Sequence, residues 1–193
     1  VSIAANSALF GVLSPLLAWA RQHSALARKL EDRDDPLAQL PDSVDASKLS
    51  GQVVLVGYGR IGQHIAAQLQ AAHVHFVVAD ESREVVESLR LAHIPAVTGA
   101  LSDPATLVQA HIARASTLVI CVPDGVLIRQ LVDTARQLNS SVKVLVHGAS
   151  LDDAQLLQQE LQIEVLVDEQ ELAKGMARQV LDWALPKGAS SGH

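Results

Sequence analysis

The feature that most constrains the fold is a regular alternation of short apolar runs and helical patterns from Gln52 onward. Each run is short and rich in β-branched residues, which is typical of strands covered on both faces of a parallel sheet. The runs are residues 53–56, 74–79, 96–98, 116–122, 142–146 and 163–167. Between them, apolar side chains recur at helical spacing, as at Ile61, Ile65 and Leu69. The alternation predicts an α/β fold with a doubly wound sheet of six parallel strands.

Three glycines follow the first run, in the order Gly57-Tyr58-Gly59-Arg60-Ile61-Gly62. Alone, the G-x-G-x-x-G pattern has low specificity, but here it directly follows a predicted strand and opens a predicted helix over residues 61–72. In that context Gly57 makes the tight turn, Gly59 lets the backbone approach a phosphate, and Gly62 lets helix and strand pack closely. The pattern therefore predicts a Rossmann-like sheet that binds an anionic ligand at the positive end of the helix.

Acidic residues close the second predicted strand, at Asp80 and Glu81. A carboxylate at Asp80 can accept hydrogen bonds from ribose 2′- and 3′-hydroxyls, whereas it would repel the 2′-phosphate of NADP. Glu81 adds to that repulsion. Arg60 is interpreted as a phosphate partner, because a cation at a helix N-terminus is otherwise unfavourable. The alternatives are a retained sheet that binds no ligand and, for Arg60, a solvated side chain.

Four further residues have side chains that could bind a metal ion or a ligand or act as a nucleophile, and we assign them mainly structural roles. His73 and His75 resemble a metal pair, but they have no third ligand near them in sequence, so we interpret them as loop histidines. His147 ends the fifth predicted strand, directly after the apolar run, where it either contacts a nucleotide or lies at the sheet edge; we favour the latter. Cys121 is interpreted as a core residue. We assign no catalytic residue and no metal ligand, and we expect no enzyme, because the substrate region of a dehydrogenase is missing.

The N-terminal part has a different character. Residues 1–20 carry no charge and are long enough to cross a bilayer, with Trp19 and basic residues after it as an interface anchor. The alternative is an ordinary buried or amphipathic helix. The chain begins with Val1 and has its only methionine at Met176, so we expect a piece of a longer protein. The predicted divisions are residues 1–22 for the end of a membrane helix, 23–50 for a linker, 51–185 for the nucleotide-binding domain and 186–193 for a tail.

Charge and cysteine content exclude two classes. The formal net charge is −6, and no basic stripe with interleaved aromatic residues exists, so nucleic acid is not an expected partner. A single cysteine excludes a disulfide scaffold.

Four stretches together resemble a known domain family. They are "VVLVGYGRIGQHIA", "VVADES", "AVTGALSDPATLVQAHIARASTLVICVPDG" and "VLVDEQELAKGMARQVL". Residues 52–184 resemble the TrkA-N domain, also called the RCK or KTN domain, which is a nucleotide-sensing regulator of potassium channels and transporters. Residues 1–50, with "SIAANSALFG" and "DPLAQLPDS", resemble the last transmembrane helix and linker of a Kef-type monovalent cation:proton antiporter, closest to the YbaL branch.

The resemblance implies a homodimer that binds NAD(H) or AMP as a regulatory ligand and gates potassium efflux by the antiporter part of the same longer chain. It also implies a bacterial inner-membrane protein with this portion mostly on the cytoplasmic side. In that family the phosphates lie over residues 57–61, the ribose lies on Asp80, and the adenine lies between residues 99–101 and Val122-Pro123. The candidate binding residues are Gly57, Tyr58, Gly59, Arg60, Ile61, Gly62, Asp80, Glu81, Gly99, Ala100, Leu101, Val122 and Pro123.

Two departures from the family pattern and two rival functions remain. Ala100 stands where the family often has Asp or Asn, which removes a side-chain contact to the base, and we expect no TrkA-C domain to follow. The rivals are a fragment of an NAD-dependent oxidoreductase and a free peripheral Trk-type potassium-uptake subunit.

Overall fold

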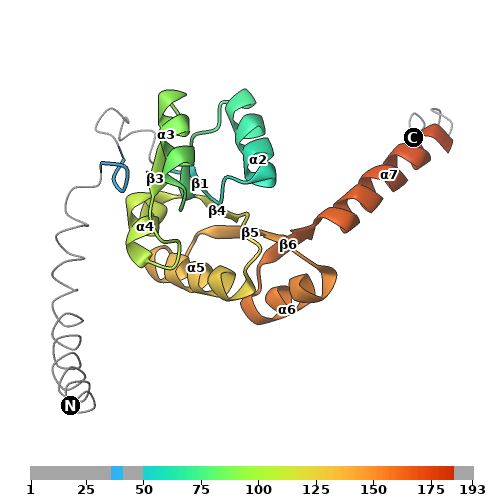
Figure 1. Ribbon diagram of the computed structural model, residues 1–193. Coiled ribbons are helices and arrows are strands. Elements are labelled where there is room, and N and C mark those ends of the chain that lie inside the picture. Colours follow the sequence, from blue (N-terminus) through green and yellow to red (C-terminus); the bar gives the residue numbers. More distant parts are fainter. Residues whose placement is uncertain (1–35, 41–49, 185–193) are drawn as a thin grey trace, which may run out of the picture.

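The computed structural model describes residues 36–40 and 50–184 (Figure 1). The predicted membrane helix over residues 1–22 therefore lies outside the described residues, as does most of the linker. The strands are β1 Val53–Val56, β2 Phe76–Asp80, β3 Ala96–Thr98, β4 Thr117–Ile120, β5 Lys143–Gly148 and β6 Glu164–Val167. The helices are α2 Arg60–Ala71, α3 Arg83–Leu91, α4 Pro104–Gln109, the 3₁₀ helix η2 Ile112–Arg114, α5 Gly125–Leu138, α6 Leu151–Leu161 and α7 Asp168–Ala184.

All six strands are parallel and form one sheet in the order β3-β2-β1-β4-β5-β6. The predicted doubly wound Rossmann-like sheet is therefore confirmed. Three strands are shorter than the apolar runs suggested. Strand β2 starts at Phe76, because Val74 lies 40% exposed in the connection before it; β4 covers only Thr117–Ile120, and β6 starts one residue late, at Glu164. The strand order reverses between β1 and β4, so the carboxyl ends of these two strands form the switch point.

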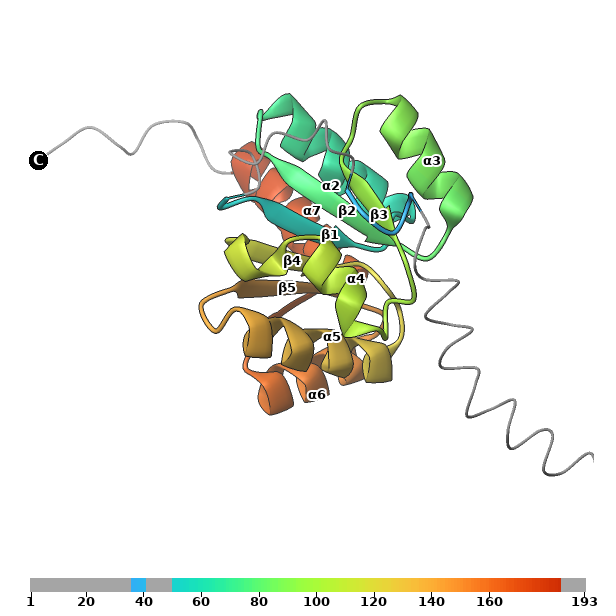
Figure 2. The ribbon, with the colours of Figure 1, turned by 90° about the vertical axis from the view of Figure 1, so that its left-hand side faces the viewer.

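Two apolar clusters lie on opposite faces of the sheet. On one face, Leu55 and Val78 pack with residues of α2 and α3, such as Ala66 and Val86. The other face carries a larger cluster that includes α4, α5 and α6. Figure 2 shows the two helical layers on either side of the strands. Every residue of β1 is buried, as expected for a central strand covered on both faces.

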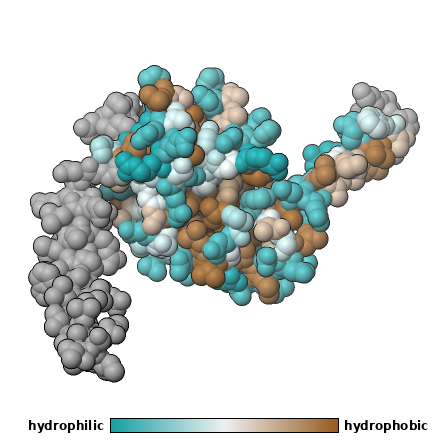
Figure 3. Space-filling model, viewed as in Figure 1, coloured by the Kyte–Doolittle hydropathy of each residue, from teal (hydrophilic) through white to brown (hydrophobic). Residues whose placement is uncertain are grey.

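Helix α7 differs from the other helices because it projects from the body and contains no buried residue (Figure 1). Apolar side chains nevertheless recur along it, at Leu172, Met176, Val180 and Trp183, a spacing that places them on one stripe. Figure 3 shows apolar surface along this helix. Within residues 36–40 and 50–184, no helix combines the length and the apolar character needed to cross a membrane.

Candidate functional site

The glycine loop lies at the switch point, between the end of β1 and the start of α2. Parallel strands leave a crevice at their carboxyl ends here, because the crossovers on the two sides run in opposite directions. Asp80 ends β2, the neighbouring strand, and so comes to the same edge. The fold therefore brings together the loop and the acidic residue that the sequence pattern selected.

The three glycines of the loop meet different constraints. Gly57 has a φ of +89°, and a Cβ there would lie 3.0 Å from the carbonyl oxygen of Cys121. A Cβ at Gly62 would lie 2.1 Å from the carbonyl oxygen of Gly57, so only glycine lets helix and strand approach this closely. A Cβ at Gly59 would meet nothing within 4 Å. The backbone at Gly59 is therefore accessible from the crevice.

Helix α2 begins without a side-chain cap at its N-cap residue, Gly59. By contrast, α3, α4, α5 and α6 each start with a polar side chain that accepts from a first-turn N–H group. Across the described ranges, no protein acceptor faces the N–H groups of Gly59, Arg60 or Ile61. The Arg60 side chain is exposed, and the part of the chain that the structure describes offers it no ion pair. Three donors and a cation at a helix N-terminus suit a phosphate group.

The carboxylate of Asp80 faces the glycine loop. Its Oδ2 accepts a hydrogen bond from the backbone N–H of Tyr58 at 2.7 Å, and its Oδ1 accepts one from Ser82 at 2.8 Å. Each oxygen of an ionised carboxylate can accept more than one hydrogen bond, so both can still accept from hydroxyl groups of a ligand. The half-buried Tyr58 ring packs against the cluster on the α2 and α3 face. Asp80 thus connects two loops at the crevice and keeps acceptor capacity on its open side.

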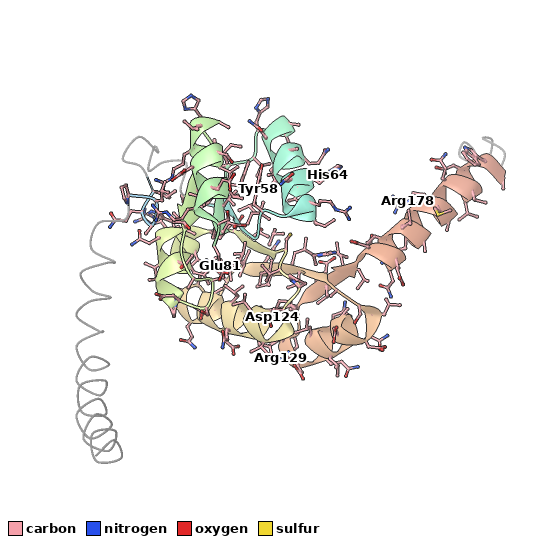
Figure 4. The ribbon with its side chains drawn as sticks, in the orientation of Figure 1. Tyr58, His64, Glu81, Asp124, Arg129 and Arg178 are labelled. Atoms are coloured by element: carbon pink, nitrogen blue, oxygen red, sulfur yellow. The ribbon has the colours of Figure 1, made fainter. Side chains whose placement is uncertain are left out.

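Glu81 lies beside Asp80 but acts on a different loop. Its Oε1 accepts from the N–H of Leu101 at 3.0 Å, and its carbonyl oxygen accepts from Thr98 Oγ1 at 3.3 Å. The sequence placed Glu81 among the candidate binding residues, with a role in repelling a 2′-phosphate, but did not assign Thr98 to the binding site. The signal for Thr98 was its position at the carboxyl end of a predicted strand. In the view of Figure 4, Glu81 lies between the layer of α2 and α3 and the layer of α5, whereas Tyr58 lies close to α2 and α3.

The two loops predicted to hold the adenine, residues 99–101 and 122–123, combine buried and exposed side chains. Leu101 is 5% exposed and packs in the core, so its contribution to a ligand would come from the backbone. A Cβ at Gly99 would lie 2.5 Å from Thr106 Oγ1, while Ala100 is exposed. On the other side, Val122 packs against the core. The following Pro123 is exposed at the crevice edge, before the start of α5.

A hollow of about 160 Å³ lies between α2 and the first turn of α7. It is lined largely by apolar side chains, including Ile61 and Ile65, together with Cys121 and His147. The Nε2 of His147 lies 2.9 Å from Oδ1 of Asp168, which joins the end of β5 to the start of α7. Burial raises the pKa of the Cys121 thiol to about 11, so the group is neutral at pH 7 and behaves as an apolar residue.

The paired histidines lie in the connection between α2 and β2. His73 and His75 are both exposed, and His73 has a φ of +56°, a left-handed conformation just after the helix end. Among the described residues, no group of three or more His, Cys, Asp or Glu side chains is arranged to hold a metal ion.

Comparison with known proteins identifies relatives over most of this chain. Residues 53–169 match the TrkA-N domain. The chain is 28% identical over 176 residues to the putative cation/proton antiporter YbaL of Escherichia coli, covering 91% of this chain and 30% of that protein. It is 33% identical over 105 residues to the putative K⁺ efflux antiporter KefB of Alkalimonas amylolytica, covering 54% of this chain and 16% of that one. The chain thus spans less than a third of the length of these relatives.

Solved structures agree with this relationship. The crystal structure of the TrkA-N domain of the inner membrane protein YbaL from Escherichia coli is 27% identical, with a TM-score of 0.62, covering 68% of this chain and 97% of that one. The GsuK channel bound to NAD shares the fold, with 21% identity, a TM-score of 0.55 and coverage of 81% and 26%. So does the Kef C-terminal domain of Shewanella denitrificans in its AMP-bound form, with 20% identity, a TM-score of 0.55 and coverage of 70% and 82%.

Proposed function

The chain belongs to the TrkA-N domain family, and from this premise we propose that it is a nucleotide-sensing regulatory domain. It binds NAD(H) or AMP at the glycine loop and controls a monovalent cation:proton antiporter in the rest of a longer chain. The observation that carries the proposal is the contact of 2.7 Å between Asp80 and the N–H of Tyr58, next to the uncapped start of α2. A sugar acceptor and a phosphate seat are thereby held side by side.

The described residues fit an adenine nucleotide. The free N–H groups of Gly59, Arg60 and Ile61 would hold phosphate oxygens, and the open space at Gly59 lets the ligand reach the backbone. Asp80 would accept from the ribose hydroxyls. The adenine would lie between residues 99–101 and Val122-Pro123. The bound nucleotide acts as a regulatory ligand and supplies no redox step.

Carboxylates at the sugar end of the crevice favour ligands without a 2′-phosphate. Asp80 and Glu81 are adjacent, and neither pairs with a cation in the part of the chain that the structure describes. A phosphate group on the ribose 2′-oxygen would place like charges within a few ångströms, which is unfavourable in a partly desolvated crevice. The proposed selectivity is therefore for AMP and NAD(H) over NADP(H).

A second copy of the chain is the proposed partner of helix α7. The stripe of Leu172, Met176, Val180 and Trp183 is exposed over more than half of each side chain, and apolar patches of this kind mark contact surfaces in soluble domains. The apolar hollow beside the root of α7 offers a surface of matching character. Packing of α7 from each copy on the body of the other would bury both surfaces and form the expected homodimer.

A regulatory role, rather than a catalytic one, is consistent with the relatives of this chain, which are transport proteins. YbaL and KefB are described as antiporters, and the YbaL domain comes from an inner membrane protein. This supports our proposal over a fragment of an oxidoreductase or a free potassium-uptake subunit. The proposed location is the cytoplasmic side of the bacterial inner membrane. Nucleotide occupancy can bias the antiporter only if the two states of the assembly bind the nucleotide with different affinity.

A thermal-shift screen tests the binding step directly. The purified chain is heated with AMP, ATP, NAD, NADH or NADPH, and the midpoint of unfolding is compared with that of the ligand-free protein. Ligands that bind only the folded state raise the midpoint by mass action. We expect AMP or NAD(H) to raise it and NADPH to have a smaller effect. A panel in which no adenine nucleotide changes the midpoint contradicts the proposed function.

A further inference from the structure

Arg90, in the last turn of α3, binds four backbone carbonyl groups at once. Its Nε and Nη2 donate to the carbonyl oxygen of Ala96 at 2.9 and 2.8 Å, which anchors the guanidinium group on β3. The same group donates to Pro36 at 2.6 Å, to Leu37 at 3.0 Å and to Gln39 at 2.5 Å. Only a planar group with five N–H donors can satisfy such a set, and lysine cannot replace it.

The segment that Arg90 holds, residues 36–40, also covers the open edge of the sheet. Strand β3 is an edge strand, so its outer N–H and C=O groups have no strand partner. The N–H of Thr98 donates to the carbonyl oxygen of Leu37 at 2.9 Å, and the carbonyl of Ala96 is occupied by Arg90. Figure 2 shows this segment alongside β3. The outer edge of β3 is thereby hydrogen-bonded to the predicted linker.

Two leucines fix the segment on both sides of the sheet. Leu37 packs against the cluster on the α2 and α3 face, and Leu40 packs against the larger cluster on the opposite face. The segment therefore crosses the sheet edge with an apolar anchor on each side. The segment thus has two independent apolar contacts, and its carbonyl groups accept four hydrogen bonds, three from Arg90 and one from Thr98. These contacts argue for a specific docked position.

The docked segment is connected to the candidate site by short contacts. The backbone N–H of Thr98 donates to the docked segment at Leu37, and the Oγ1 of Thr98 donates to the carbonyl oxygen of Glu81 at 3.3 Å. Glu81 in turn holds the N–H of Leu101, in the loop assigned to the adenine. Thr98 is also paired in register with Asp80. One residue thus lies between the linker and both acidic residues of the site.

We propose that residues 36–40 are a docking segment whose attachment to Arg90 and Thr98 is energetically coupled to nucleotide binding. Docking fixes Thr98, Glu81 and the loop of residues 99–101 in the arrangement that the adenine requires, so the nucleotide and the docked linker favour one another. This inference rests on the proposed function and names the route by which occupancy reaches the segment that precedes the domain. Thermodynamic linkage requires the coupling to act equally in both directions.

Amide hydrogen exchange and calorimetry on the whole chain test the two halves of this inference. Thr98 is protected in the wild type, and added AMP or NADH slows its exchange further. In Arg90→Ala the Thr98 amide exchanges faster, and the affinity for the same nucleotide falls about five- to tenfold. Arg90→Lys keeps the charge but not the fork of donors and behaves like Arg90→Ala. Leu37→Ala changes only the docking segment, outside the sheet, and shifts both readouts in the same direction even if the Arg90 variants fold poorly.

Matched controls separate docking from general effects. Leu91→Ala removes a neighbouring side chain that is 84% exposed, and Arg114→Ala removes an exposed arginine; both keep wild-type exchange and affinity. Unchanged Thr98 exchange in Arg90→Ala and Leu37→Ala contradicts docking. Faster Thr98 exchange with unchanged nucleotide affinity contradicts the coupling alone. A wild-type chain that binds neither AMP nor NADH overturns the proposed function, and the coupling with it, while the exchange data still report whether the segment docks.

Discussion

The Oδ2 atom of Asp80 lies 2.7 Å from the backbone nitrogen of Tyr58, so the acid at the end of β2 is hydrogen-bonded to the loop that follows β1. Asp80 ends β2 and Tyr58 follows β1, the neighbouring strand, so the two residues meet at the carboxyl edge of the sheet beside the switch point. The contact holds the carboxylate at the crevice beside the uncapped start of α2. The proposal for ligand binding depends on this relationship.

Asp80→Ala is expected to weaken AMP and NADH binding at least about tenfold, because a charged hydrogen-bond acceptor contributes about 1.5–3 kcal/mol. The side chain lies at the surface of a crevice, so the fold should remain intact. Isothermal titration calorimetry measures the affinity. Asp152→Ala, which removes an exposed acid in the first turn of α6, is the control. Equal affinities for wild type and Asp80→Ala would remove the ribose assignment.

Asp80→Asn is expected to narrow the preference for NADH over NADPH. The amide oxygen can still accept from Tyr58, but the negative charge that opposes a 2′-phosphate is gone. The ratio of the two dissociation constants is the relevant quantity, since both affinities change. A ratio identical to that of the wild type would show that Asp80 does not set the selectivity.

Gly59→Val is expected to abolish nucleotide binding without loss of stability. The new side chain would extend into the open space above the loop and contact no protein atom through its Cβ. Thermal unfolding without ligand should match the wild type, and titration with AMP should give no heat. Gly175→Ala, at another glycine with nothing within 4 Å of a Cβ, is the control. Normal AMP binding by Gly59→Val would move the phosphate seat elsewhere.

Gly62→Ala is expected to have the opposite profile and to lower the free energy of unfolding by about 1–3 kcal/mol. Its Cβ would lie 2.1 Å from the carbonyl oxygen of Gly57, so α2 must shift away from β1. Urea unfolding followed by circular dichroism measures the change. Stability equal to that of the wild type would mean that the helix can move at no cost.

Cys121 is expected to react slowly with iodoacetamide at pH 7 and faster as the pH approaches 11. Burial raises the pKa of its thiol from 9.0 to about 11, and only the thiolate is a good nucleophile. The same shift has a stability consequence. Burial favours the neutral thiol in the folded state. Its contribution to the free energy of unfolding is complete below pH 9 and is lost as the pH rises toward 11, because the unfolded chain then releases the thiol proton more readily than the folded protein does. Cys121→Ala should unfold with less pH dependence over that interval; unchanged dependence would contradict the role of the thiol.

Met176→Glu is expected to convert a dimer into a monomer. Met176 lies in the exposed apolar stripe of α7, and no residue of that helix is buried within one copy. Light scattering coupled to size-exclusion chromatography gives the mass. Arg178→Glu, on the opposite side of the same helix, should leave the mass unchanged. A wild-type chain that is monomeric at all accessible concentrations would contradict the α7 interface.

Much of the fold could be predicted from sequence because its determinants are local. The β-branched runs mark all six strands, since burial on both faces leaves no polar position in the centre of a strand. The glycine loop could be placed for the same reason. Gly57 and Gly62 are required by the local backbone geometry, which a short sequence pattern is enough to indicate. Strand ends were less certain, as at Val74, because apolar side chains also occur in the turns.

The parts that sequence did not predict depend on contacts between distant segments. The local sequence around Arg90 gives no indication that its side chain binds the carbonyl groups of residues more than fifty positions earlier in the chain. Glu81 could be assigned to the site but not to Leu101, because that hydrogen bond exists only once β2 and β3 are adjacent. The sequence also could not predict that α7 is exposed. An amphipathic stripe has the same sequence pattern whether it packs on its own chain or on another.

A double-mutant cycle measured by calorimetry shows whether the Asp80 carboxylate binds the ribose hydroxyls of the nucleotide. AMP and 2′,3′-dideoxy-AMP are titrated into the wild type and into Asp80→Ala, so that the four combinations lack neither group, the hydroxyls, the carboxylate, or both. We predict that removal of the hydroxyls weakens wild-type binding about tenfold or more but changes the affinity of Asp80→Ala by less than about twofold. Equal losses in the two proteins would show that Asp80 does not hold the ribose.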